Sequence, residues 1–312
     1  MMVFKEQPSW LQVVMMVRGS VARRILGRLL VTTLFAALVT EVYREEIMSA
    51  SLTMTPFSLI GVALGIFLGF RNNSGYERFW EGRKLWGKLV NTTRSMTRQV
   101  MTLVSAKVEG PALDDYHRDY VHRIAAYVHA LRFHLRGEST RYTELARLLP
   151  NDDLEAVAQS SNPPIAMIHT MGEKLRDAWQ RGWIDTYHLP IIESSLTLLA
   201  DIQGGCERIK ATPIPFSYTL LMHRIVAIYC FALPFGIVQQ AHVWTPLVVA
   251  LVSYAFYGLD AIGEELEMPF GTDDHDLPLE QLSTMMEVNV RERLGETDLP
   301  ALREPDSNNV LL

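Results

Sequence analysis

The sequence predicts an all-α membrane protein in which four apolar helices are continuous with a helical and more polar region. Two observations lead to this class. Hydrophobic residues make up 48% of the 312 positions and charged residues 21%, but a mean hydropathy of only +0.08 hides a strong segregation, with apolar runs near both ends and a polar middle. In addition, no window shows the sustained alternation of apolar and polar residues that a strand would need.

Four apolar runs are candidate membrane spans, at Ile25–Val42, Pro56–Phe70, Phe216–Val238 and Val243–Ile262. The second run has 15 residues and covers roughly 22 Å as a helix, less than the ~30 Å of a hydrocarbon core. Its polar continuation must therefore reach membrane depth while shielded by protein or water. A buried helix in a soluble protein is the alternative for each single run, but four runs with a consistent charge bias favour the membrane.

The distribution of basic residues predicts the orientation of these spans. Basic residues precede the first span, follow the second and precede the third, whereas the two outer connections, 43–55 and 239–242, hold only Arg44. Because basic loops stay in the cytoplasm, both termini are expected to be cytoplasmic. The basic residues in question are Arg18, Arg23, Arg24, Arg28, Arg71, Arg78, Arg83, Lys84, Lys88, Arg208 and Lys210.

Residues 71–215 predict a cytoplasmic helical region that shares its long helices with the spans. Apolar residues recur there at helical spacing, as on the face that holds Tyr120, Ile124 and Leu131. Residues 1–290 are therefore expected to form a single, continuous all-helical unit. The polar, proline-containing end, residues 291–312, is expected to be a disordered tail.

The second span carries two ridges that repeat every four residues. One ridge is formed by Gly61, Gly65 and Gly69, and the other, about 100° further round the helix, by the bulky side chains of Val62, Ile66 and Phe70. A glycine face lets neighbouring helices approach closely in lipid. The bulky face would then point at a common axis and form a narrow hydrophobic pore from several copies of the helix. Spacing alone is equally compatible with side chains that fill the core of one subunit.

Other classes of function find little support in the residues. The net charge of −6 gives no reason to expect nucleic acid as a partner, and the absence of nucleophile, zinc and nucleotide motifs argues against an enzyme. His117, His122, His129 and His134 fall at irregular helical angles and are expected to form interhelical hydrogen bonds. Cys206 follows two glycines, and close packing is favoured there over a reactive thiol because no base lies nearby in the sequence.

An acidic stretch follows Pro269 and raises the question of calcium. Asp273 and Asp276 are candidate ligands, since Ca²⁺ prefers hard oxygens. Calcium takes six or more oxygens, so other groups would have to contribute. On the residues alone, a solvated acidic linker is favoured.

Three long motifs resemble the bestrophin family in its bacterial branch. They are GFRNNSGYERFWEGRKLWGKLVN at Gly69–Asn91, DIQGGCERIKATPIPFSY at Asp201–Tyr218 and EMPFGTDDHDLPLE at Glu267–Glu280, and with the four spans the resemblance covers about residues 5–290. It implies a homopentamer of mostly helical subunits around one central pore, as a multi-pass protein of the bacterial inner membrane. It also implies passive conduction of small monovalent ions.

The resemblance also implies roles for particular residues. Val62, Ile66 and Phe70 fall on the positions that form the family's membrane neck. A second, cytosolic constriction is expected upstream of the GGCER motif, with Ile191 as the candidate and Leu189 and Ile192 as alternatives.

Calcium dependence and selectivity are less closely defined by the resemblance. Animal members conduct chloride and are opened by calcium held near an acidic cluster that Asp273 and Asp276 match, but the cluster departs here at Met268, Thr272 and His275. The departures favour a channel without a cofactor that opens independently of Ca²⁺. The permeating ion is expected to be Cl⁻ or Na⁺/K⁺. A non-conducting membrane scaffold that docks a cytoplasmic partner is the alternative function.

Overall fold

The chain is all-helical in the computed structural model, which describes residues 9–16, 19–46, 53–106, 110–138, 144–305 and 311. In this part of the chain, extended pairing is limited to one bridge between Val104 and Ile184. The all-α prediction is confirmed. The helices are α1 (Trp10–Met15), α2 (Ala22–Arg44), α3 (Met54–Leu103), α4 (Pro111–Arg136), η1 (Leu145–Arg147), α5 (Asn151–Gln159), α6 (Pro163–Gln180), α7 (Leu189–Ala211), α8 (Phe216–Ala241), η2 (His242–Trp244), α9 (Thr245–Glu267), α10 (Leu279–Arg291) and η3 (Glu292–Leu294).

The four predicted apolar runs lie in α2, the first part of α3, α8 and α9. Three segments of the described chain are long and apolar enough to cross a membrane, namely Ala22–Arg44, Met54–Leu103 and Phe216–Glu267. The last of them holds both α8 and α9, joined by the short η2 turn, so a count of four crossings stays a prediction. Arg18 and much of the first outer connection lie outside the described residues.

Helix α3 bears out the expectation that the second apolar run continues without a break. It has 50 residues and therefore a length of roughly 75 Å at 1.5 Å per residue. Two compact units share it: an apolar-helix unit of residues 2–79 and 213–269, and a polar-helix unit of residues 80–212 and 270–312. The first part of α3 belongs to the apolar-helix unit and the rest to the polar-helix unit.

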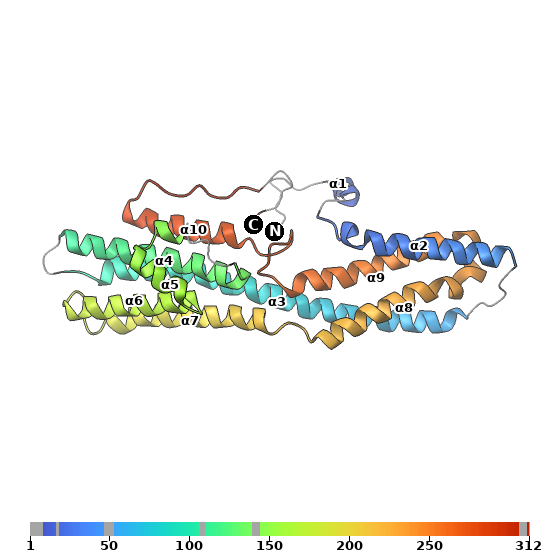
Figure 1. Ribbon diagram of the computed structural model, residues 1–312, viewed down its shortest axis with the longest axis horizontal. Coiled ribbons are helices and arrows are strands. Elements are labelled where there is room, and N and C mark those ends of the chain that lie inside the picture. The colour runs from blue at the N-terminus through green and yellow to red at the C-terminus, as the bar shows by residue number, and fades with distance from the viewer. Residues whose placement is uncertain are drawn as a thin grey trace. The chain divides into compact units, whose positions relative to one another are not determined.

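In the apolar-helix unit, α2, α8 and α9 pack with the first part of α3 (Figure 1). The core between them contains Leu64 and Leu68 of α3, Val226 and Leu233 of α8 and Tyr257 of α9. One face of each helix therefore supplies the core, and the remaining faces stay exposed, as Leu34, Ile66 and Leu251 show. Apolar side chains on the outside are typical of helices that face lipid or other subunits.

In the polar-helix unit, α4 packs against α6 and α10 (Figure 1). Pro111 stands at the first turn of α4, where its missing N–H costs no hydrogen bond, and Gly137 ends the helix with a φ of +68°. Most of the second half of α4 is buried, including Tyr127 and Leu131. The predicted helical region thus has α4 as its centre.

The segment predicted as a disordered tail begins at the last residue of α10. Glu296, just beyond η3, lies 2.7 Å from Nε2 of His122 and 2.6 Å from Nε of Arg291. These ion pairs hold the start of the segment against α4. Residues 306–310 and 312 lie outside the described chain, and disorder beyond the contact stays a prediction.

Candidate functional site

The three neck candidates lie on an exposed face of α3. Val62, Ile66 and Phe70 are 65%, 53% and 65% exposed, although all three are large and apolar. Leu64 and Leu68, on the other side of the same helix, are 2% and 0% exposed. The neck side chains therefore do not fill the core of this chain, and they face lipid, another subunit or a lumen.

Among the three glycines of the predicted ridge, Gly61 alone lies against another side chain of the described chain. A Cβ atom at Gly61 would come 2.7 Å from the Tyr229 hydroxyl oxygen of α8, so glycine is required there for close helix packing. At Gly65 and Gly69 a Cβ atom would meet nothing within 4 Å in the described chain. These two positions are open to a helix from another molecule.

A buried ion pair fixes α3 to α9 directly after the last neck residue. Nη1 of Arg71 lies 2.6 Å from Oδ1 of Asp260, and the two side chains are 0% and 1% exposed. Arg71 follows Phe70 in the chain, so the pair sets the rotation of α3 at that level. Charged residues among apolar helices are costly and are retained mainly for a specific role.

The second carboxylate oxygen of Asp260 contacts side chains of two further helices. Nδ1 of His223 on α8 lies 2.5 Å from Oδ2, and Nη1 of Arg28 on α2 lies 3.9 Å from it. Asp260 thereby joins four helices through one side chain. Arg71 has fewer charged partners, because its one other acidic neighbour in the described part of the chain is Glu267, at 4.0 Å. Its Nε and Nη2 atoms are buried without a hydrogen-bond partner in the described part of the chain.

The three candidates for a cytosolic constriction differ in exposure at the start of α7. Ile191 is 45% exposed, Leu189 is half-buried and Ile192 is fully buried in the polar-helix unit. A fully buried side chain cannot line a lumen. Ile191, the most exposed of the three, and Leu189 therefore remain candidates for the constriction.

Asp273 and Asp276 form a local turn. The backbone N–H of Asp273 donates to Oδ2 of Asp276 at 2.8 Å, and Asp276 is buried while Asp273 is exposed. Burial raises the pKa of Asp276 to about 6, against the opposing effect of that hydrogen bond. Throughout the described residues, no group of three or more His, Cys, Asp or Glu is placed to hold a metal ion. The turn engages the carboxylate of Asp276, and independence from Ca²⁺ stays a prediction.

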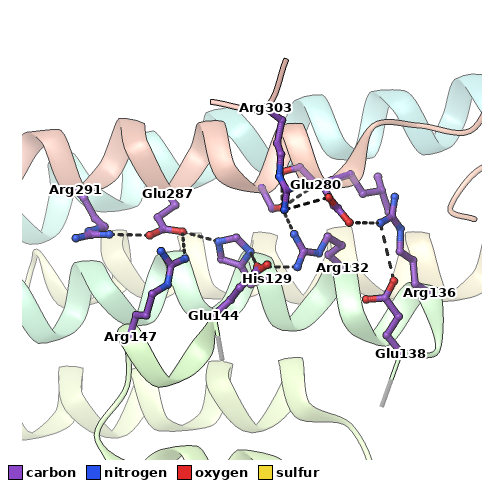
Figure 2. A network of polar contacts seen from close by, with 12 residues as sticks. His129, Arg132, Arg136, Glu138, Glu144, Arg147, Glu280, Glu287, Arg291 and Arg303 are labelled. Atoms are coloured by element: carbon purple, nitrogen blue, oxygen red, sulfur yellow. Dashed lines mark hydrogen bonds and ion pairs between the residues drawn. The ribbon is translucent and has the colours of Figure 1, made fainter. Parts of the chain in front are cut away.

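Three histidines of α4, namely His122, His129 and His134, lie beside carboxylates from other parts of the chain, and His129 is the most buried of them. It is 1% exposed, and its Nε2 and Nδ1 atoms lie 2.8 Å and 3.0 Å from carboxylate oxygens of Glu287 and Glu144 (Figure 2). Arg147 and Arg291 also face Glu287, at 3.3 Å and 2.7 Å. This network joins α10 and the segment before η1 to α4.

The network predicts a loss of stability in acid. A hydrogen bond from His129 outweighs burial and, with Arg132, lowers the pKa of Glu144 to about 2. A lowered carboxyl pKa stabilises the fold above the unfolded value of ~4.3, and this stabilisation is lost as the pH falls towards 2. The full shift corresponds to about 3 kcal/mol, and partial exposure of Glu144 reduces it to about 1–2 kcal/mol.

Glu144→Gln should therefore lower the free energy of unfolding by about 1–2 kcal/mol at pH 7 and leave it unchanged near pH 2. Thermal unfolding followed by circular dichroism across this range measures the difference. Glu138→Gln is the matched control, because Glu138 is 43% exposed and forms only a long ion pair with Arg136, at 4.0 Å. An equal loss of unfolding free energy at pH 7 and pH 2 would contradict a stabilising role for the ionised Glu144 carboxylate.

Cys206 is packed rather than reactive. It is fully buried, and burial raises its pKa to about 12, with smaller effects of Glu207 and Glu81 in the same direction. A Cβ atom at the adjacent Gly205 would come 3.0 Å from both terminal methyl groups of Leu85. Gly205 thus permits the close contact between α7 and α3 that the sequence predicts, whereas a Cβ atom at Gly204 would meet nothing within 4 Å in the described chain.

The chain is similar to bacterial membrane proteins over nearly its whole length. Residues 2–292 match the family model described as "Bacterial/Fungal Bestrophin protein". A voltage-dependent anion channel-forming protein of Ralstonia nicotianae is 40% identical over 299 residues, which cover 96% of each chain, and YneE of Escherichia coli, which bears the same description, is 38% identical over 98% of each chain. The crystal structure of a bacterial bestrophin homologue from Klebsiella pneumoniae matches with a TM-score of 0.82 and 36% identity, over 88% of this chain and 99% of that one.

Proposed function

Because the chain belongs to the family of bacterial and fungal bestrophins, we propose that it is a homopentameric ion channel with a hydrophobic neck. The exposed apolar face of α3 supports this proposal most directly. Val62, Ile66 and Phe70 repeat every four residues and stand outside the core, where five copies would form three stacked rings. Such rings offer no polar group to replace the hydration of an ion, so a small change in their spacing can dewet the pore and close it.

The proposed assembly also gives a role to Gly65 and Gly69 and includes an orientation for the membrane spans. Gly65 and Gly69 would receive a neighbouring subunit, because no described residue of this chain fills the space beside them. The excess of basic residues next to the apolar segments supports a topology with both termini in the cytoplasm of a bacterial inner-membrane protein. Ile191, exposed at the start of α7, would form the second constriction.

We propose anions, and chloride first, as the permeating ions. Two of the relatives that cover almost the whole chain are described as anion channel-forming proteins. One observation favours the alternative of a cation pore. Glu77 is exposed on α3, in helical register with the neck face, and accepts a hydrogen bond from Asn73 at 2.9 Å. A ring of glutamates just beyond the neck attracts cations.

Reversal potentials of the purified protein in planar bilayers test this proposal. Under a gradient of NaCl, a reversal near the chloride potential is expected, and replacement of chloride by gluconate should abolish the inward movement of anions. A reversal near the sodium potential would overturn chloride in favour of Na⁺. Conduction should not change when EGTA removes Ca²⁺. Silence of the wild type and of neck variants, from a verified pentamer, would instead favour the non-conducting scaffold.

Glu77→Gln should raise the permeability of chloride relative to sodium in either case. The substitution removes five negative charges from the mouth of the neck and keeps the hydrogen bond that an amide oxygen can accept from Asn73. The reversal potential in asymmetric NaCl should move towards the chloride potential. Glu41→Gln, an exposed carboxylate of α2, is the control that should leave it unchanged.

A further inference from the structure

A pocket of about 440 Å³ in the polar-helix unit brings three arginines together. It lies between the end of α3 and the end of α10, and Arg94, Arg98 and Arg293 line it. No aspartate or glutamate is among its lining residues. Within the described chain, none of the three guanidinium groups forms an ion pair, whereas Arg123, Arg132 and Arg291 of the same unit all do. The pocket is therefore an unneutralised concentration of positive charge.

A buried hydroxyl group in the pocket also lacks a partner. Thr97 is 1% exposed, and its Oγ1 atom has no hydrogen-bond partner in the part of the chain that the structure describes. Other threonines of α3 donate back to the helix, as Thr92 does to the Lys88 carbonyl at 2.9 Å and Thr102 to the Arg98 carbonyl at 2.8 Å. A buried polar group left unpaired destabilises the fold, and a ligand oxygen that accepts from the hydroxyl would relieve this cost.

The side-chain amide of Asn289 supplies a further hydrogen-bond donor to the pocket. Oδ1 of Asn289 accepts hydrogen bonds from both Nε and Nη2 of Arg94, at 2.9 Å and 2.5 Å, so Nη1 of Arg94 and the amide nitrogen of Asn289 stay as donors. Guanidinium, hydroxyl and amide donors together match the oxygens of a phosphate group, which arginine binds in a bidentate manner. Met101 adds an apolar wall, and the volume falls in the ~300–1,000 Å³ range of small-molecule sites.

We propose that this pocket binds an organic phosphate, with the phosphate group between Arg94, Arg98 and Arg293 and the hydroxyl of Thr97 as a further donor. The carbon part of the ligand would lie against Met101. Soluble phosphate esters and phospholipid headgroups share this chemistry. The proposal does not depend on ion conduction and stands on the pocket alone.

Thermal unfolding of the full-length protein in detergent tests the proposal. Pyrophosphate and AMP serve as soluble probes, dihexanoyl-phosphatidylglycerol as the headgroup probe, and sodium sulfate at equal ionic strength as the reference. A ligand that binds only the folded state raises the midpoint temperature of unfolding as the ligand concentration rises. A rise with AMP or pyrophosphate above the sulfate reference supports a soluble ligand, and a rise with the lipid alone supports a headgroup. Stabilisation by none of the probes beyond sulfate would overturn the proposal.

Two variants separate binding from folding. Arg98→Gln should weaken the apparent affinity by about tenfold, the effect of losing one charge-assisted interaction. Thr97→Val should also weaken it, yet should raise or preserve the stability of the ligand-free protein, because the substitution removes an unpaired buried hydroxyl. Arg83→Gln, an exposed arginine of α3 outside the pocket, should behave as the wild type. Equal weakening in Arg83→Gln, or full affinity in Arg98→Gln, would contradict the site.

Discussion

Phe70→Ala should increase the single-channel conductance and the open probability several-fold. Phe70 is the last of the three neck residues, is 65% exposed on α3 and has the largest side chain of the set. In a fivefold ring, replacement of five phenyl groups by methyl groups widens the constriction and lets water remain in it. A hydrophobic constriction that stays wet no longer closes by dewetting. Single-channel recording in planar bilayers measures both quantities.

Phe67→Ala is the matched control for this prediction. Phe67 is on the same helix, is 52% exposed and undergoes the same substitution, but it lies about 100° round the helix from the centre of the neck face. Conductance should change little in this variant. Ile66→Ala should resemble Phe70→Ala, since Ile66 lies one turn away on the neck face. Unchanged currents in both neck variants, from intact pentamers, would contradict a gate at these rings.

Local features of the chain could be predicted because they depend on residues near one another in the sequence. The four-residue spacing places Val62, Ile66 and Phe70 on one face of any helix, and the structure leaves that face outside the core. The absence of a helix breaker after Phe70 indicated the continuous helix α3. Apolar runs likewise indicated α2, α8 and α9, with ends that moved by a few residues.

Features that depend on distant residues could not be predicted in the same way. Arg71 and Asp260 are 189 positions apart, and the sequence showed only an arginine after one apolar run and an aspartate near the end of another. The choice between Ile191 and Ile192 needed the rotation of α7 against its neighbours, which packing alone decides. The arginine pocket needed the approach of α10 to α3. In each case the residue types were visible and their partners were not.

Asp260→Ala should destabilise the folded protein by about 3–5 kcal/mol, the usual cost of breaking a buried ion pair. The substitution leaves the guanidinium of Arg71 buried with only Glu267 nearby, at 4.0 Å, and it also removes the partner of His223. Thermal unfolding in detergent, together with the fraction of pentamer in size-exclusion chromatography, measures the effect.

Arg71→Met should cost less than Asp260→Ala, because Asp260 keeps His223 at 2.5 Å and Arg28 at 3.9 Å when Arg71 is lost. The double variant Arg71→Met with Asp260→Leu should recover part of the stability, since apolar side chains of similar volume often replace a buried pair without loss. It should nevertheless alter gating, because nothing specific then fixes the rotation of α3 just after Phe70. Normal stability in Asp260→Ala alone would show that the pair is dispensable. Normal currents in a stable double variant would show that it does not position the neck.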